Sequence, residues 1–205
     1  VLDASASMET RVTGGSQRID LLNAGIRSFY EALNEDEIAL SRVQVAAVSV
    51  GGDTSDAELL MDWTDAADFR PFSLSAGHST PLGAGVLLAL EAIETQKLEL
   101  RKFGISYTRP WIFILTDGEP TDHKETWDLA STRAREAEAS QKVEIFPIGI
   151  GNIDLTKIQT LSDRRSPMTM EATHFRELFV WLSASLGQIS RSVPGANVDL
   201  LPTDP

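Results

Sequence analysis

The chain has 205 residues, of which 42% are hydrophobic and 23% are charged, enough apolar material for one domain with a substantial core. Acidic residues outnumber basic ones by 30 to 18, and the formal net charge is −12 at pH 7. Phosphate backbones and anionic membrane surfaces repel such a chain, so its charge argues against nucleic-acid binding. The absence of cysteine excludes disulfides, thiolate metal sites and a cysteine nucleophile. No apolar stretch reaches the roughly 20 residues that span a bilayer, so membrane insertion is not expected.

Helices and strands are expected to alternate along the chain. Val1-Leu2-Asp3 has the character of a strand end, so we expect further residues before Val1 in the full-length protein. Hydrophobic periodicity and turn residues predict, in the first half of the chain, a helix over 16–34 with Ser16 as N-cap, a buried strand over 43–50, a short antiparallel strand over 57–63 and a helix from Pro81 with Thr80 as N-cap. In the second half they predict a strand over 111–115, a helix opened by a capping box of Asp122 and Glu125, and a strand over 143–151. A short helix near 154–162 and a final helix from about His174 to Ile189 follow.

This alternation predicts the fold class. Strands that alternate with helices favour a doubly wound α/β fold, with a mostly parallel central sheet, helices on both faces and one antiparallel edge strand. We expect a single domain over 1–192. The tail over 193–205 contains three prolines and one glycine, and we expect it to run over the surface.

Three polar loops fall where predicted strands end or the central helix begins. They are Asp3-Ala4-Ser5-Ala6-Ser7, Gly77-His78-Ser79-Thr80-Pro81 and Thr116-Asp117-Gly118-Glu119. In an open α/β sheet, ligands bind beyond the carboxyl ends of the strands, where such loops gather. These loops are therefore the candidate site.

The side chains in these loops offer oxygen alone. Asp3 and Asp117 carry carboxylates, and Ser5, Ser7 and Thr80 carry hydroxyls. Oxygen ligands suit a hard divalent cation such as Mg²⁺ and disfavour zinc and copper. If the first loop is extended, the side chains of Asp3, Ser5 and Ser7, at positions i, i+2 and i+4, can point to the same side. Each residue also has a local explanation, as a loop cap, a helix N-cap or a turn residue, but their joint placement favours a metal site.

The pattern resembles the metal-ion-dependent adhesion site (MIDAS) of von Willebrand factor A (VWA) domains. That family combines an Asp-x-Ser-x-Ser string with a distant Thr and Asp, and all five positions match here: Asp3, Ser5, Ser7, Thr80 and Asp117. The resemblance covers nearly the whole chain and implies a non-enzymatic, metal-dependent binding module with a Rossmann-like fold. One departure is Ala6, which stands where the family usually has glycine.

Within the family, the chain is most similar to the bacterial tellurite-resistance TerY type, which includes YegL-like proteins. Two segments carry this narrower resemblance, residues 114–122 and Ser192-Val193-Pro194-Gly195. It implies a cytoplasmic role in a stress or metal-resistance system, with partners of kinase or phosphatase type.

The resulting hypothesis is a module that docks an Asp or Glu of a protein partner through bound Mg²⁺, or through Mn²⁺ or Ca²⁺ in its place. We expect a partner-binding rim around the metal, although the two histidines in it have an alternative explanation as loop or helix-start surface. The rim residues are His78, Ser79, Glu119 and His123.

The main alternative is a Mg²⁺-dependent hydrolase or phosphotransferase. The sequence has no phosphate-cradling Gly-x-x-x-x-Gly-Lys-Ser/Thr loop and no Ser-His-Asp arrangement at a nucleophile elbow. The position two residues after Asp3 is Ser5 and not the second aspartate that an Asp-x-Asp phosphotransferase carries. We therefore expect no enzyme. A third alternative is a structural subunit whose site has lost its metal.

Overall fold

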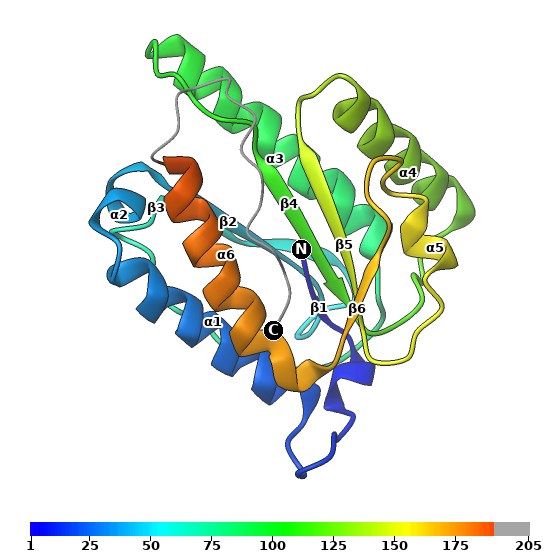
Figure 1. Cartoon of the computed structure of the whole chain (residues 1–205). Helices are drawn as coiled ribbons and strands as arrows, with labels where there is room; N and C mark the ends of the chain where they lie inside the picture. Colours follow the sequence, from blue (N-terminus) through cyan, green and yellow to red (C-terminus); the bar gives the residue numbers. More distant parts are fainter. Residues whose placement is uncertain (191–205) are drawn as a thin grey trace.

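A six-stranded sheet forms the centre of the molecule (Figure 1). The computed structural model describes residues 1–190, with side chains for 1–187, so the tail predicted over 193–205 lies outside the described residues. The strand order is β3-β2-β1-β4-β5-β6. Only the β2–β3 pair is antiparallel, which confirms a mostly parallel sheet with one antiparallel edge strand. The strands are β1 (Leu2–Ala4), β2 (Gln44–Gly51), β3 (Ala57–Asp65), β4 (Trp111–Thr116), β5 (Glu144–Ile150) and β6 (Met168–Met170).

Helices cover both faces of this sheet. Figure 1 shows α1, α2 and α6 over one face and α3, α4 and α5 over the other. Each face has its own apolar core: Phe29 of α1 packs against Phe69 and Phe179 on one side, and Leu82 of α3 belongs to a separate cluster with Trp127 of α4. The helices are η1 (Ala6–Glu9), α1 (Arg18–Asn34), α2 (Glu37–Arg42), α3 (Leu82–Lys102), α4 (Lys124–Ala139), α5 (Thr156–Gln159), η2 (Ala172–His174) and α6 (Phe175–Ser190).

Two short elements, α2 and β6, were not predicted from the sequence. The six residues of α2 make fewer than two turns, too few for a hydrophobic periodicity to show. Strand β6 has three residues, and its pairing with β5 depends on how the chain returns after α5. Strand β6 therefore depends on a partner about 20 residues earlier in the chain, whereas α2 has a local N-cap, since Asp36 accepts the amides of Ile38 and Ala39.

The start of α1 corrects the predicted N-cap. The helix begins at Arg18 with Gln17 in the N-cap position, not at Ser16. Ser16 instead lies in a tight turn, where its carbonyl accepts a hydrogen bond from the Val12 amide and a β-bridge joins Arg11 to Gln17. Ser16 therefore belongs to this turn and not to the helix start that the local sequence pattern predicted.

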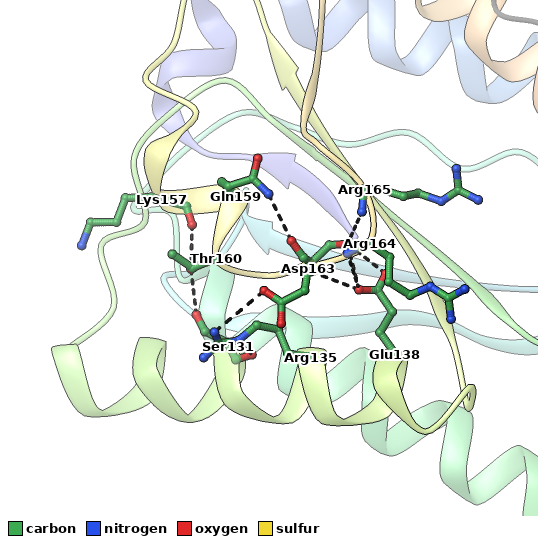
Figure 2. Close-up of polar contacts among 10 residues, drawn as sticks. Ser131, Arg135, Glu138, Lys157, Gln159, Thr160, Asp163, Arg164 and Arg165 are labelled. Atoms are coloured by element: carbon green, nitrogen blue, oxygen red, sulfur yellow. Dashed lines mark hydrogen bonds and ion pairs between the residues drawn. The ribbon is translucent and has the colours of Figure 1, made fainter.

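The buried carboxylate of Glu138, on α4, binds the segment that leads into β6. Glu138 is 1% exposed. It accepts hydrogen bonds from the Ser162 hydroxyl at 2.9 Å and from the amides of Asp163 and Arg164 at 3.2 Å (Figure 2). Burial of a carboxylate is favourable only when such donors replace water. Glu138 therefore holds the α5–β6 connection in place.

The connections reverse direction next to β1. From β1 the chain crosses one face through α1 to β2, and it later returns across the other face through α3 to β4. The carboxyl ends of β1 and β4 therefore lie side by side at a topological switch point. In open α/β sheets, this is where ligands bind.

Candidate functional site

Asp3 stands at the centre of this edge of the sheet. It lies on β1 and is 0% exposed. Its Oδ1 accepts the Ser5 amide at 2.8 Å, and its Oδ2 accepts the Thr116 hydroxyl at 2.6 Å and the Asp117 amide at 3.4 Å. Asp3 thus joins the end of β1 to the end of β4. No described cation lies within ion-pair distance of it.

Burial of Asp3 has an electrostatic consequence. Desolvation raises the pKa of its carboxyl above the ordinary 3.8, and the nearby Asp117 adds to this, while the hydrogen bonds from Ser5 and Thr116 oppose it. The folded state therefore binds the Asp3 proton more tightly than the unfolded chain does. Between 3.8 and the raised pKa, this group lowers the stability of the fold as the pH rises.

The two serines and Asp117 form a chain of contacts. Ser5 Oγ and Ser7 Oγ are 2.9 Å apart, and the Ser7 hydroxyl donates to Asp117 Oδ1. The first loop is not extended as predicted, because residues 6–9 form the 3₁₀ helix η1. This turn, rather than a two-residue repeat, brings the hydroxyls together. Ser7 is exposed, so the cluster opens to solvent.

Ala6 fits this turn without backbone strain. Among the described residues, the non-glycine residues with positive φ are His78 and Gln141, and Ala6 is not one of them. The Ala6 amide donates to the carbonyl of His78 at 3.1 Å, which ties the first loop to the loop that carries Thr80. Alanine in the usual glycine position is therefore compatible with the local geometry.

Thr80 does not cap α3, contrary to the prediction. The helix begins at Leu82, with Pro81 in the N-cap position. The caps come from the β4–α4 loop, because Asp122 accepts the amides of Gly83 at 2.8 Å and Ala84 at 3.0 Å. The predicted capping box is wrong for the same reason: Asp122 serves α3, and α4 begins at Lys124.

The Thr80 side chain is thereby left available to the site. Its main chain is held by Thr121, whose Oγ1 accepts the Thr80 amide at 3.0 Å and whose amide donates back to the Thr80 carbonyl at 2.9 Å. The Thr80 hydroxyl, by contrast, bonds to none of the described residues. A Cβ built on Gly118 would lie 3.8 Å from Thr80 Oγ1 and 3.5 Å from Ser7 Oγ, so both hydroxyls border the same point.

Arg18 is the main residue that the sequence analysis missed. Its Nη1 lies 2.6 Å from Asp117 Oδ2, and the exposed fractions of the two side chains are 20% and 0%. The sequence did contain a signal for Arg18. It is the first residue of α1, and a helix that follows a parallel strand begins near the carboxyl end of that strand. Beside it lies a surface cavity of about 420 Å³, lined by Gly151, Asn152, Thr169, Met170, Glu171 and His174.

The predicted rim residues all lie in loops at this edge of the sheet. His78 Nδ1 is 3.3 Å from Ser55 Oγ, and the Ser79 hydroxyl donates to the Ser55 carbonyl at 3.3 Å, so both contact the β2–β3 turn. Glu119 and His123 are exposed, the latter at the start of α4. Their role towards a partner stays a prediction.

The donor set suits a hard divalent cation. It combines two carboxylates with three hydroxyls, a composition that Mg²⁺, Mn²⁺ and Ca²⁺ accept. Within residues 1–190, no group of three or more His, Cys, Asp or Glu side chains could hold a metal by itself, so any ion here depends on the hydroxyls. None of the helices in this range is long and apolar enough to cross a membrane.

The comparison with known proteins identifies the family. The family described as von Willebrand factor type A domain matches residues 1–179, and the chain belongs to it. VWA domains are commonly protein-interaction modules rather than enzymes. No match was found among curated protein sequences.

Two solved structures show the same fold. The VWA domain of SpRpn10 has a TM-score of 0.56 and 13% identity, over 84% of this chain and 89% of that one. The vWF domain of the type V pili tip protein Mfa5 from Porphyromonas gingivalis has a TM-score of 0.60 and 13% identity, over 95% of both chains. At these identities the likeness concerns the fold alone.

Proposed function

We propose that this VWA domain binds a protein partner through a divalent cation held by Asp3, Ser5, Ser7, Thr80 and Asp117. One observation carries the proposal: at the switch point the fully buried Asp3 carboxylate, which no described Lys, Arg or His side chain pairs, lies in one hydrogen-bonded cluster with the two serines and Asp117. The Thr80 hydroxyl borders the same cluster next to Gly118. Mg²⁺ is the first candidate, with Mn²⁺ and Ca²⁺ as alternatives. A bound ion would supply an electrophilic centre for an Asp or Glu of the partner.

The residues of the chain have separate tasks in this proposal. The Thr116 hydroxyl and the Ser5 amide hold Asp3 in place, and Ser7 orients Asp117 through its hydroxyl. Ser7 is exposed while Asp3 is fully buried, so a ligand approaches from the serine side. The same burial disfavours the hydrolase or phosphotransferase alternative, because a nucleophilic aspartate must reach its substrate.

The biological setting is proposed from the narrower resemblance alone. Similarity to TerY-type tellurite-resistance proteins supports a cytoplasmic role in a bacterial stress system, with a kinase or phosphatase as partner. The loops that carry His78, Ser79, Glu119 and His123 would form the rim that selects this partner.

Thermal unfolding with and without metal tests the proposal. A ligand present at about 100 times its Kd stabilises a fold by about 2.7 kcal/mol, which for a domain of this size raises Tm by roughly 5–10 °C. We expect Mg²⁺ or Mn²⁺ to raise Tm, EDTA to reverse the rise, and Asp117→Ala to abolish it. Asp68→Ala is the matched control, because Asp68 is an exposed aspartate just beyond β3.

The two halves of the proposal have separate failure modes. If Mg²⁺, Mn²⁺ and Ca²⁺ all leave the wild-type Tm unchanged, the metal site is wrong. If the metal-loaded protein hydrolyses phosphoester substrates and Asp3→Ala stops the turnover, the binding-module assignment is wrong and the enzyme alternative is right.

A further inference from the structure

Asp117 divides its two oxygens between two neighbours. Oδ1 accepts the Ser7 hydroxyl on the side of the proposed metal site, and Oδ2 meets Arg18 Nη1 at 2.6 Å on the other side. The Asp117 side chain is 0% exposed, whereas Ser7 is exposed and the Arg18 side chain is 20% exposed, so a buried carboxylate meets partners on the solvent side. Arg18 therefore fixes the orientation of this carboxylate and also brings a full positive charge to the edge of the site.

That charge changes the electrostatic balance of the site. With Asp3 and Asp117 ionised, the two carboxylates carry two negative charges, and a divalent cation alone would neutralise them. Arg18 adds one positive charge. The loaded site then carries a net positive charge, which weakens its hold on the cation and strengthens its attraction for an anion.

Among the described contacts, the guanidinium hydrogen-bonds through Nη1, to Asp117. Its Nε is buried and has no hydrogen-bond partner among the described residues. Its Nη2 lies against Gly151, where an added Cβ would come within 2.9 Å. Gly151 lines the 420 Å³ cavity beside the site, so Arg18 lies between Asp117 and a hollow in the surface.

We propose that Arg18 is a specificity-determining residue, which lowers the affinity of the site for the metal and raises its affinity for a carboxylate ligand. This inference rests on the proposed metal-binding function. Its signature is a pair of opposite effects. A merely structural residue would weaken both kinds of binding when it is removed, whereas the loss of Arg18 strengthens one and weakens the other.

Calorimetry with Mg²⁺ and Mn²⁺ tests the first effect, on wild-type protein and on three variants. Arg18→Gln removes the charge and keeps a polar side chain, and we expect it to bind the cation roughly tenfold more tightly. Arg18→Lys keeps the charge and should stay close to wild type. Arg27→Gln is the matched control, because it removes an exposed arginine from the same helix.

Acetate tests the second effect. Protein-bound Mn²⁺ broadens the methyl proton NMR signal of acetate that binds to it, so a titration reports the affinity of the loaded site for a carboxylate. We expect Arg18→Gln to bind acetate several-fold more weakly, and Arg18→Lys and Arg27→Gln to match wild type. Far-UV circular dichroism of each variant verifies that it is folded.

The outcomes separate this inference from the proposed function. If wild-type protein binds neither cation, the proposed function fails and the role of Arg18 fails with it. If wild type binds Mn²⁺ but Arg18→Gln binds it more weakly, or binds acetate as well as wild type does, only the inference about Arg18 is overturned.

Discussion

Gly51 offers a quantitative test of how the loops of the site are held together. It ends β2 with φ +72°, a conformation that favours glycine. A Cβ added there would lie 2.5 Å from the Ser79 carbonyl oxygen and 2.9 Å from both the Gly77 oxygen and Ser5 Cα. All three atoms belong to the loops that carry Ser5 and Thr80. Gly51→Ala must therefore push these loops apart.

Two contributions set the loss of unfolding free energy that we expect for Gly51→Ala. Positive φ costs a non-glycine residue about 1–2 kcal/mol, and overpacking against backbone adds about 1–3 kcal/mol. Gly104→Ala isolates the first contribution, because Gly104 has φ +67° and nothing within 4 Å of an added Cβ. We expect Gly51→Ala to lose roughly 2–5 kcal/mol of unfolding free energy, and Gly104→Ala roughly 1–2 kcal/mol.

Urea unfolding with and without Mg²⁺ measures both free energies and the stabilisation by metal. Gly51→Ala should lose most of the Mg²⁺-dependent stabilisation, since the loops that carry Ser5 and Thr80 are displaced from each other, whereas Gly104→Ala should retain it. Equal destabilisation by the two substitutions would refute the steric argument. A full Mg²⁺ response in Gly51→Ala would show that the loop contacts do not position the site.

Three further substitutions separate the site from its support. Asp122→Ala removes both caps from α3 and should lower the unfolding free energy by about 1–2 kcal/mol. It should also weaken Mg²⁺ binding in calorimetry, and an unchanged Mg²⁺ affinity would show that Thr80 is positioned without Asp122. Asp3→Asn should flatten the fall in stability above pH 3.8 in urea unfolding with EDTA, and a slope equal to wild type would contradict the burial argument. Glu138→Ala should lower Tm, because it removes about 3 kcal/mol of unfolding free energy, but the rise in Tm on Mg²⁺ addition should remain. Loss of that rise would show that the α5–β6 connection supports the site.

Much of the fold could be predicted from local patterns. The apolar runs at Val43–Val50 and Trp111–Leu115 indicate buried strands wherever the chain places them, and their alternation with helices leads to a parallel sheet. In such a sheet the loops after the strands gather at one edge, so the nearness of Asp3 to Asp117 follows from the order of elements. The oxygen-only chemistry of the candidate ligands is likewise a property of the sequence itself.

The tertiary structure decided what holds those ligands in place. Asp122 caps a helix that begins 40 residues earlier in the chain, Thr121 holds the main chain of Thr80, and Arg18 reaches an aspartate 99 residues away. Local propensity assigned Thr80 and Asp122 to nearby helix starts, because each residue type also serves as an N-cap. Such partners are chosen by which loops the folded sheet brings together, and no window of neighbouring residues contains that information. The clearest case is Ser7, whose hydroxyl reaches the site through a 3₁₀ turn that places it between Ser5 and Asp117.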